Sequence, residues 1–495
     1  MKIPRLLPFL APLLAMPLFA HDLGIFSNNT DIGSVSRAGT VDYDATWDAY
    51  TVSASGENMW FDNDEFHYVW KKVDGDVSLQ ADIAFVGSQG NAHRKAGVMI
   101  RQDLDHDSVY ADAVVHGDGL TSFQFRTAKG GVTREIQANV WAPRRLRIEK
   151  VGDTAYVYFA QNTGEELQPG GGSTPLELHG SFYVGLLVCA HDNTDFQTAI
   201  LSNVKLSDQP SGHAVKIRSI IETVPVASGD RRAIYATENL IEAPNWAPNE
   251  DHLIYNGGGR LYKLGVAPGS EPELLEYGHL RRANNDHGIT PDGKTIIISD
   301  GTDEGQSVIY TAPIAGGTPT RITAKYPSYW HGVSPDGRTL AYVGRRDDVW
   351  GIFTIPTAGG EETRITSAPN GGLDDGPDYS PDGKYIYINS DRGGNMQIWR
   401  MLVDGSELTQ ITNDDYDNWF PHPSPDGTML TILSYPKHTE GHPRDKDIVL
   451  RIMDLETGEI RALAAFFGGQ GTINVPSWNP ASTHIAYVRY QPAVD

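Results

Sequence analysis

A four-residue turn recurs through the second half of the chain, and its spacing constrains the fold more than any other feature. The turn reads Ser or Thr followed by Pro-Asp-Gly at residues 290–293, 334–337, 380–383 and 424–427, and weaker copies occupy 247–250 and 479–482. Counted from one proline to the next, the steps are 43, 44, 46, 44 and 55 residues. Repeats of this length that each hold several strands are typical of the blades of a β-propeller.

Each repeat can be divided into four strands. In the turn, Pro sets φ, Asp bonds to nearby backbone and Gly takes a positive φ. An apolar strand follows, as at 339–343 or 385–388, and then a third strand and a short outer strand that ends at Thr323, Thr366 or Thr412. The last copy stops two strands early, and we expect the strand candidates at 215–221 and 232–237 to complete it. This closure predicts a ring of six blades without open edges.

The first part of the chain has a different pattern. Apolar residues alternate with polar ones over segments such as 77–85, 155–159 and 182–188, and no stretch keeps a period of 3.6 residues. A period of two is typical of strands with one buried face, and many such strands in one domain favour an antiparallel β-sandwich. The protein is therefore expected to be all-β, with a sandwich over 21–208, a polar joint, and the ring over 214–495.

Charge and cysteine content limit the partners. The chain has 40 Lys and Arg against 63 Asp and Glu, a net charge of −23, so nucleic acid and anionic lipid are poor partners. Beyond the first twenty residues no apolar run is long enough to span a bilayer, so membrane insertion is not expected. The only cysteine, Cys189, allows neither an internal disulfide nor a Cys-based zinc site, and we expect it to be a small buried residue.

Residues 1–20 have the pattern of an export signal. Lys2 and Arg5 precede an apolar run over 6–19, which is interrupted by prolines and ends at Ala20 before the sequence turns polar. We predict a Sec-type signal peptide over 1–20. Because no cysteine follows it directly, the mature protein is expected to be periplasmic or secreted, and not a lipoprotein.

The repeats resemble those of the TolB-type six-bladed propeller, in which Ser-Pro-Asp-Gly precedes an Ile-Tyr strand and often Ser-Asp-Arg, here residues 390–392. The resemblance covers about residues 214–492 and implies a fold but no single function, because propellers serve as binders, lyases, hydrolases and scaffolds. The first region resembles a concanavalin-like sandwich. Its segments 93–101 and 116–122 are similar to those of bacterial exported proteins that join such a sandwich to a TolB-like ring.

The repeat register selects the side chains expected at the channel mouth. Four and three residues before the turn proline lie His287, His331, Asp378 and His422, which we predict to surround the axis as candidate catalytic groups. The three histidines are candidate ligands of a divalent metal ion such as Mn, Ca or Zn. The alternative that these histidines only make structural hydrogen bonds stays open.

The first functional hypothesis is a carbohydrate-binding protein that cleaves an oligo- or polysaccharide as a lyase or glycoside hydrolase. Histidines and carboxylates can hold a metal or act as acid and base on a sugar. Oligogalacturonate lyases resemble propellers with metal-binding histidines. Trp330 and Trp419 would stack on sugar rings. The remaining substrate-binding candidates are Arg392 and three residues of a long insertion in the fifth blade, namely His442, Arg444 and Lys446.

Two alternatives stay open beside the enzyme. In one, the protein only binds: the sandwich holds a carbohydrate, and the ring docks a protein or an oligosaccharide. In the other, the protein is a TolB-type scaffold of the cell envelope, and a partner peptide enters the channel. The candidates on the sandwich are His93, Arg94, His116, Asp118, His191 and Asp192.

Overall fold

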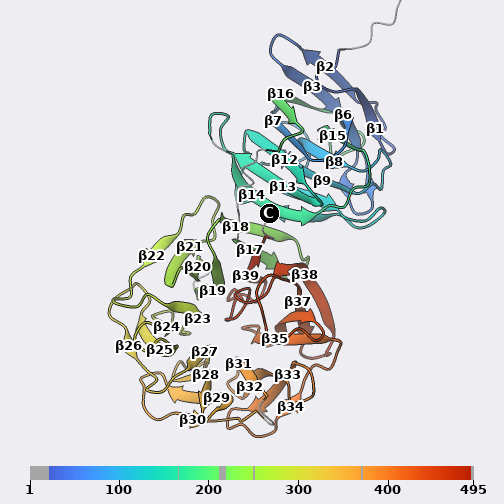
Figure 1. Ribbon diagram of the computed structural model, residues 1–495. Helices are drawn as coiled ribbons and strands as arrows, with labels where there is room; N and C mark the ends of the chain where they lie inside the picture. Colours follow the sequence, from blue (N-terminus) through green and yellow to red (C-terminus); the bar gives the residue numbers. More distant parts are fainter. Residues whose placement is uncertain (1–21, 166, 211–218, 249–250, 369–371, 492–495) are drawn as a thin grey trace, which may run out of the picture.

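The computed structural model describes residues 22–165, 167–210, 219–248, 251–368 and 372–491. Within these ranges every regular element is a β-strand, so the prediction of an all-β protein is confirmed. Figure 1 shows two bodies, a pair of packed sheets formed by the first part of the chain and a ring formed by the second. The described residues contain no helix that could cross a membrane. The predicted signal peptide over 1–20 lies outside the described residues.

Two sheets make up the first body. The longer one continues into the ring and has ten strands, of which the first seven belong to this body. In spatial order they are β1 (Asn28–Ile32), β6 (Phe66–Val73), β15 (Phe182–Cys189), β8 (Lys95–Arg101), β9 (Tyr110–His116), β10 (Thr121–Arg126) and β11 (Arg134–Gln137), followed by β18 (Arg231–Thr237), β17 (Ser219–Pro225) and β39 (His484–Tyr490).

The second sheet has seven strands and packs against the first. Its order is β14 (Gln168–Pro175), β13 (Thr154–Ala160), β12 (Arg145–Val151), β7 (Val77–Phe85), β16 (Gln197–Ser207), β3 (Ala49–Ala54) and β2 (Thr40–Asp44), and a small hairpin of β4 (Met59–Trp60) and β5 (Asn63–Asp64) lies apart. The core between the two sheets contains Val98 and Phe123 from one and Leu79 and Ile148 from the other, all fully buried. These residues alternate with others along their strands, as the period of two predicts. Cys189 is buried and free, as expected.

The ring contains five four-stranded antiparallel sheets, one for each of the first five repeats. Their strands, each set given from the inner strand outward, are β19 (Ile241–Trp246), β20 (His252–Gly257), β21 (Arg260–Gly265) and β22 (Glu273–Leu275); β23 (Ala283–Ile289), β24 (Thr295–Asp300), β25 (Val308–Pro313) and β26 (Thr320–Arg321); β27 (Ser328–Val333), β28 (Thr339–Arg346), β29 (Val349–Pro356) and β30 (Thr363–Arg364); β31 (Asp374–Tyr379), β32 (Tyr385–Ser390), β33 (Gln397–Leu402) and β34 (Thr409–Gln410); β35 (Tyr416–Pro423), β36 (Met429–Pro436), β37 (Lys446–Asp454) and β38 (Ile460–Gly468).

The repeated turn connects the inner strand of each sheet to the second strand. In the third repeat the Ser334 hydroxyl donates to the Asp336 carboxylate at 2.6 Å, and the same carboxylate accepts the main-chain N–H of Arg338 at 3.0 Å. Gly337 has a φ of +71°, which only glycine adopts without strain. The four full copies share this arrangement, so the prediction that their aspartates are turn residues is confirmed.

Every one of the five inner strands has an irregularity at the same place in the repeat. The pairing with the second strand shifts register between Asp375 and Asp378 in β31 and between Trp419 and His422 in β35, and the other three inner strands shift there too. Gly376 and Phe420, inside these irregularities, have φ values of +59° and +51°. A bulge of this kind adds a residue to one strand and redirects its side chains. The residues around it supply the side chains of the candidate site.

The last repeat differs from the other five. Its strand β39 pairs antiparallel with β17, which pairs with β18, so strands from the two ends of the region meet as the sequence predicts. These strands do not form a separate four-stranded sheet, however, because β18 also pairs in parallel with β11 through Ile136↔Arg231 and Gln137↔Arg232. The structure therefore has five four-stranded blades where six were expected, and the last strands join the ten-stranded sheet.

A buried ion pair fastens the strands of this last repeat. The Glu222 carboxylate on β17 accepts hydrogen bonds from Arg489 Nε and, at 2.6 Å, from the Tyr487 hydroxyl on β39. Arg231 of β18 lies 3.6 Å from the same carboxylate. Burial alone would raise the pKa of Glu222, but the two arginines hold it below its usual value. The carboxylate is thus ionised and fully paired.

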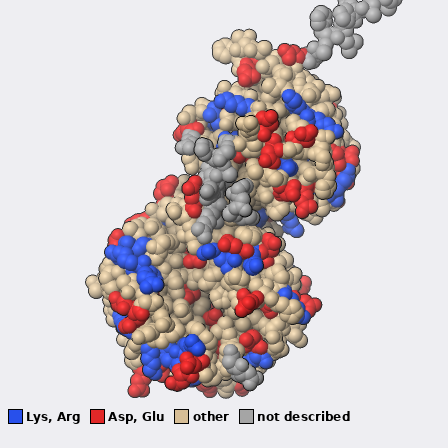
Figure 2. Space-filling model, viewed as in Figure 1, with Lys and Arg blue, Asp and Glu red and all other residues tan. Residues whose placement is uncertain are grey.

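Charges are distributed over the surface without one dominant patch on the face seen in Figure 2. Small groups of Lys and Arg alternate with groups of Asp and Glu around the outer edge of the ring. The negative net charge therefore does not form one continuous acidic surface on this face.

Candidate functional site

Four titratable side chains from different repeats meet inside the ring, and we call them the mouth cluster. They are Asp286 of β23, His331 of β27, Asp375 of β31, and His442 from the insertion between β36 and β37. His331 Nε2 lies 3.2 Å from Asp375 Oδ1, and His442 Nε2 lies 3.7 Å from Asp375 Oδ2. Three of the four are less than one-tenth exposed, and the side chain of His442 is 26% exposed. The cluster is thus reached from solvent beside His442.

His331 carries a proton on both ring nitrogens. Its Nδ1 faces the main-chain oxygen of Asn474 at 3.2 Å and its Nε2 faces the Asp375 carboxylate, and both of these groups accept hydrogen bonds. Burial would lower the pKa of His331, but Asp286 and Asp375 together raise it to about 9. The side chain is therefore an imidazolium near neutral pH, and it holds the pKa of Asp375 below its usual value against the opposing effect of burial.

Asp286 is the member of the cluster closest to titrating near neutral pH. Burial raises its pKa to about 7, with a further contribution from the nearby Asp375 carboxylate, although His331 opposes the shift. Asn284 Nδ2 donates to Asp286 Oδ2 at 3.0 Å and its Oδ1 accepts the main-chain N–H of Asp286. A buried carboxyl with a pKa in this range is typical of functional sites.

His442 is brought to the cluster by the insertion in the fifth repeat. Its Nδ1 bonds to Gln470 Oε1, and its ring packs against Trp419 at 4.4 Å and Phe420 at 5.1 Å between centroids. Burial lowers the pKa of His442, so this ring is neutral where His331 is charged. The Trp419 side chain is 1% exposed, so it supports His442 and is not a platform for a sugar ring as predicted.

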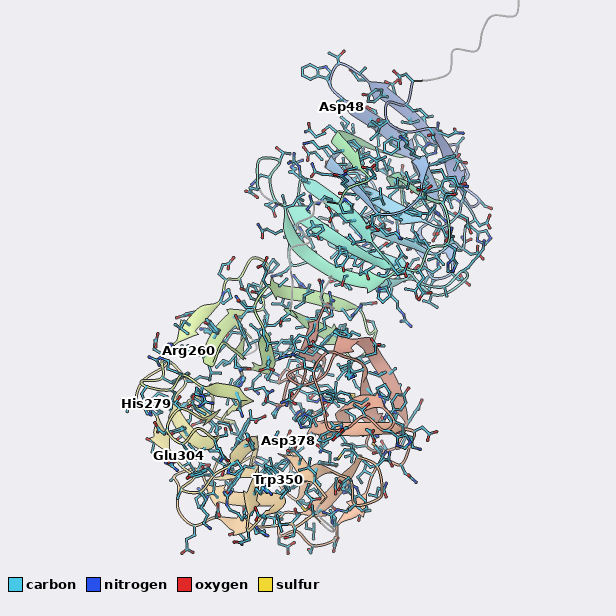
Figure 3. All side chains as sticks on the ribbon, in the orientation of Figure 1. Asp48, Arg260, His279, Glu304, Trp350 and Asp378 are labelled. Carbon is cyan, nitrogen blue, oxygen red and sulfur yellow. The ribbon has the colours of Figure 1, made fainter. Side chains whose placement is uncertain are left out.

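A second pair lies deeper in the ring. Asp378 Oδ2 contacts His422 Nδ1 at 3.0 Å, and His422 Nε2 donates to the main-chain oxygen of Ile473 at 2.7 Å. Burial raises the pKa of Asp378. Figure 3 shows Asp378 near the middle of the ring, whereas Arg260, His279 and Glu304 lie toward its outer side. Asp378 and His422 thus meet inside the ring, but both are buried.

An irregular segment fills the ring next to this pair. Residues 469–476, which we call the inner segment, precede the last turn. Besides the two histidine contacts, Gly471 O accepts the N–H of Ala243 at 2.6 Å, and Pro476 O accepts Asn245 Nδ2 at 2.5 Å. The first, third and fifth inner strands thus all bond to this one segment. A peptide passing through the channel would have to displace it.

His287 does not join either group. Its Nε2 faces the main-chain oxygen of Ile254 at 3.3 Å, and burial lowers its pKa to about 4. It is directed toward the neighbouring sheet and away from the mouth cluster. The prediction that all three histidines surround one centre is therefore wrong for His287.

The predicted metal set does not assemble. His331 and His422 point both ring nitrogens at oxygen acceptors of the protein, so neither offers a free lone pair to a metal ion. Among the described residues no three His, Cys, Asp or Glu side chains are grouped so that they could hold a metal. The geometry supports hydrogen bonding by these histidines, the alternative that the sequence left open.

Most of the residues predicted to bind substrate instead make contacts within the protein. Trp330 is 1% exposed and packs over Gly288, where an added Cβ would lie 1.9 Å from its ring, so it belongs to the core. Arg392 forms an ion pair with Asp374 at 2.5 Å and does not face the mouth cluster. Arg444 contacts Asp445 at 3.3 Å, and Lys446 is exposed at the start of β37.

The two central carboxylates were not among the residues selected from the sequence, although a signal was present. Asp286 lies five residues and Asp375 six residues before their turn prolines, which is one and two positions before the earliest selected position. The bulge in each inner strand shifts which side chains face the mouth. Because the bulge is not visible in the spacing of the repeats, the register alone selects His331 but neither of these two carboxylates.

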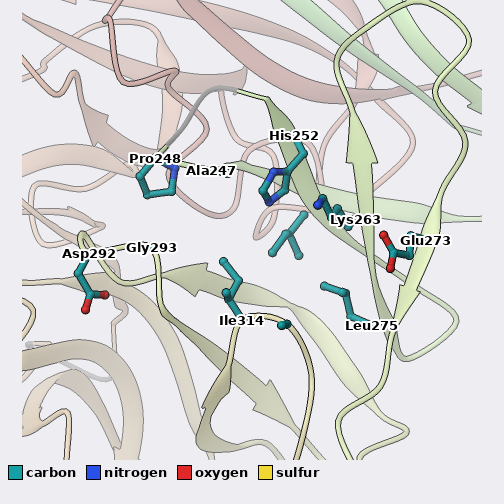
Figure 4. Close-up of a pocket in the computed structure, with 11 residues that line it drawn as sticks. Ala247, Pro248, His252, Lys263, Glu273, Leu275, Asp292, Gly293 and Ile314 are labelled. Carbon is teal, nitrogen blue, oxygen red and sulfur yellow. The ribbon is translucent and has the colours of Figure 1, made fainter.

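One hollow of the ring surface lies away from the mouth cluster. A cavity of about 500 Å³ lies between the first two sheets, lined by Pro248, His252, Lys263, Glu273 and Asp292 among others. Figure 4 shows these side chains next to the repeated turns. No member of the mouth cluster lines it. Because its charged groups lack the buried pairing of the mouth cluster, we place the candidate site at the cluster and not in this cavity.

Comparison with known proteins concerns the ring. Residues 327–494 match the family described as the TolB beta propeller domain. An uncharacterised protein of Agrobacterium fabrum is 46% identical over 290 residues, which are 59% of this chain and 97% of that protein. A solved structure of a TolB-like protein from Agrobacterium tumefaciens is 47% identical and has a TM-score of 0.54, over 56% of this chain and 99% of that one.

A more distant likeness bears on the enzyme hypothesis. An oligogalacturonate lyase solved in complex with manganese is 16% identical, over 50% of this chain and 73% of that one, with a TM-score of 0.36. At these values the likeness carries no argument about substrate or metal.

Proposed function

Because the chain belongs, through its ring, to the TolB-like β-propeller proteins, we propose that it is an exported binding protein of TolB type. Its ring engages a segment of a protein partner at the mouth cluster. The observation that carries this proposal is the mouth cluster, in which His331 and Asp375 are buried while His442 is partly exposed to solvent. The ring that holds it is similar to a TolB-like protein. We place the protein in the periplasm or outside the cell, in line with the predicted signal peptide.

The charge of the mouth cluster supports a cationic partner group. Asp286 and Asp375 share a region with one imidazolium, His331, and one neutral histidine, His442, so the mouth cluster has a net negative charge once Asp286 ionises. A Lys or Arg side chain, or a free N-terminal amine, would neutralise the excess charge. Because the inner segment fills the ring, the partner docks at the mouth and does not thread through.

Two finer features of the architecture belong to the same proposal. The strands β39, β17 and β18, with the bridge between Trp478 and Ile485, act as a sixth blade that closes the ring. The two packed sheets form a concanavalin-like sandwich, with domain boundaries near 208 and 214. The support for both is the strand pairing described above.

The carbohydrate-cleaving hypothesis has less support in the geometry. The two tryptophans that were to bind a sugar are buried, and two of the three histidines use both nitrogens in protein contacts. We therefore place catalysis second to binding.

Site-specific crosslinking tests the proposal. A photoreactive amino acid replaces Gln470 beside the mouth cluster in one variant and the outer residue His279 in another. We expect a discrete crosslinked partner from position 470 only, and its loss when Asp375→Asn is added. Equal crosslinking from both positions would overturn the proposal. So would turnover of polygalacturonate, followed by the absorbance of unsaturated products, that is lost in the Asp375→Asn variant.

A further inference from the structure

A buried lysine of the first body touches a side-chain amide from a distant part of the chain. Lys95 of β8 is 2% exposed, and its Nζ lies 2.5 Å from Oδ1 of Asn58, 37 residues earlier in the sequence. N–H···O hydrogen bonds are usually longer, about 2.7–3.2 Å. Asn58 comes directly before β4, so the contact joins the β4–β5 hairpin to the long sheet. An amine and an amide are thus pressed together inside the fold.

The surroundings of Lys95 favour a reactive amine. Lys95 is paired with Cys189 of β15 on one side, and Cys189 belongs to a buried apolar cluster that also contains Met59 and Val114. Burial in these surroundings lowers the pKa of Lys95, which favours the neutral form of its amine. A neutral amine has a lone pair and is a nucleophile, whereas an ammonium is not.

The Asn58 amide is placed to accept an attack at its carbon. Its Oδ1 also accepts the main-chain N–H of Met59 at 2.8 Å. A donor fixed at a carbonyl oxygen stabilises the negative charge that develops there when a nucleophile adds to the carbon. Asn58 is partly exposed, so a small leaving molecule can reach solvent from its amide.

A carboxyl group with a free oxygen acts on the same lysine. Asp112, Glu135 and Asp64 all influence Lys95 electrostatically. Asp64 is ion-paired with two arginines, and Glu135 accepts hydrogen bonds from two glutamine side chains. Asp112 Oδ2, in contrast, is buried and has no hydrogen-bond partner among the described residues. Burial raises the pKa of Asp112 well above its ordinary value, so this group is a protonated acid.

The strand register places Asp112 on the same face of the sheet as Lys95. In the pairing of β8 with β9, Lys95 lies opposite His116 and Met99 lies opposite Asp112. Alternate residues of a strand share a face, so Gly97 is the β8 residue between Lys95 and Met99 on this face. Because Gly97 has no side chain, it leaves the space between Lys95 and Asp112 open along β8.

The sandwich residues that were binding candidates in the sequence take other partners. Arg94 donates to Gln197 Oε1 at 2.7 Å, and Asp118 and Asp192 accept main-chain N–H groups. His93 packs against His116 and His191, with ring centroids 5.7 and 5.5 Å away. The contact between Lys95 and Asn58 is therefore separate from these groups.

We propose that Lys95 and Asn58 join in an intramolecular isopeptide bond, with Asp112 as the acid that assists the reaction. Lys95 Nζ attacks Asn58 Cγ and forms the new C–N bond. The bond from Cγ to Nδ2 breaks, and Nδ2 leaves as ammonia. One proton passes from Nζ to Nδ2 through Asp112, which ends in the protonation state in which it began. The reaction needs no oxidant, reductant or cofactor.

The bond would give the first body a covalent crosslink that does not use cysteine. It fastens the β4–β5 hairpin to β8 and closes a loop between residues 58 and 95. A crosslink of this kind restricts the unfolded chain as a disulfide does. This modification is independent of the partner proposed for the mouth cluster.

Mass spectrometry of the purified full chain tests the inference. We expect the intact protein to be lighter than its sequence by one ammonia molecule. Trypsin cannot cleave after an acylated lysine, so digestion should release one branched peptide made of residues 38–71 and 95–101. Fragmentation of this peptide should place the branch at Asn58 and not at Asn63.

Three variants locate the reacting groups. Lys95→Met and Asn58→Ala should each abolish the branched peptide and restore the full mass. Asp112→Asn keeps the shape of the side chain but removes the acid, so the crosslinked fraction should fall at least about tenfold. Lys150→Met is the matched control, because Lys150 is also buried in this body but donates to the main-chain oxygen of Gly152 at 2.6 Å. This variant should keep the crosslink.

The parent protein alone can overturn the inference, so the test does not depend on the folding of any variant. A parent of full mass, with residues 38–71 and 95–101 in separate peptides, would do so. So would a loss of ammonia without the branched peptide, which would mark a cyclised asparagine elsewhere. A crosslinked fraction that is undiminished in Asp112→Asn would overturn the role of Asp112.

Discussion

His331 Nδ1 lies 3.2 Å from the main-chain oxygen of Asn474, which comes 143 residues later in the chain. The two residues belong to the third and the last repeat, so the contact joins repeats that are not neighbours. It shows that the inner segment lies within the ring and that a protonated histidine holds it there. The protonation of His331 is therefore part of what stabilises the ring.

The first prediction concerns the pH dependence of this contact. The pKa of His331 is raised from its ordinary value of 6.5 to about 9, so its stabilising effect is complete below about pH 6.5 and is lost as the pH rises through 9. In His331→Gln this loss is absent. Between pH 7 and 9.5 the parent's thermal midpoint should fall several degrees further than the variant's, about 2–4 °C per kcal/mol. Calorimetry with the exposed His279→Gln as control measures this, and parallel curves would refute it.

Asp286 should also make the protein less stable as the pH rises, but in a lower pH range than His331. Its folded-state pKa is raised from 3.8 to about 7, so ionisation destabilises the folded protein, with no effect below about pH 3.8 and the full effect above about pH 7. Asp286→Asn should be more stable than the parent at pH 8 by at least about 1 kcal/mol, since one pKa unit corresponds to about 1.4 kcal/mol. At pH 4 the difference should shrink. Thermal midpoints at the two pH values test this against the exposed control Asp347→Asn, and a variant that is less stable at both would contradict it.

Gly288 is needed where Trp330 packs on the inner strand of the second sheet. An added Cβ would lie 1.9 Å from the Trp330 ring, so Gly288→Ala should cost about 1–3 kcal/mol, as overpacked cores do. Gly301→Ala is the matched control, because a Cβ there meets its nearest atom at 3.6 Å. Denaturant unfolding of both variants measures the difference, and equal stability would show that Trp330 can move.

Replacing Glu222 should destabilise the protein more than replacing an exposed carboxylate does. Replacing it with Gln leaves Arg489 and Arg231 buried next to a neutral group, and breaking a buried pair in this way typically costs about 3–5 kcal/mol. We expect Glu222→Gln to lower the thermal midpoint strongly and to make the strands β17 and β39 accessible to hydrogen exchange. Glu459→Gln, on an exposed turn, should change neither. Unchanged exchange in β17 would mean that the pair does not fasten the two ends of the region.

The repeat made the architecture of the ring predictable, and the bulges limited what could be predicted of its site. Turn chemistry is local, so Pro335, Asp336 and Gly337 could be assigned from the sequence alone. The orientation of Asp375 depends instead on a register shift within β31, which the composition of the strand does not indicate. His442 was a candidate because it lies in a long insertion, and the structure places its Nε2 3.7 Å from Asp375 Oδ2. Trp330 and Trp419 were misjudged, because an aromatic residue beside a channel and one beneath it have the same sequence pattern.

The parallel pairing of β11 with β18 has a practical consequence for anyone who divides the protein. A fragment that begins after the joint would leave the hydrogen-bonding groups of β18 bare along one side. Such a fragment is a template for self-association, and its oligomers would be artefacts of truncation. Biochemical work on the propeller is therefore safer with both bodies on one polypeptide.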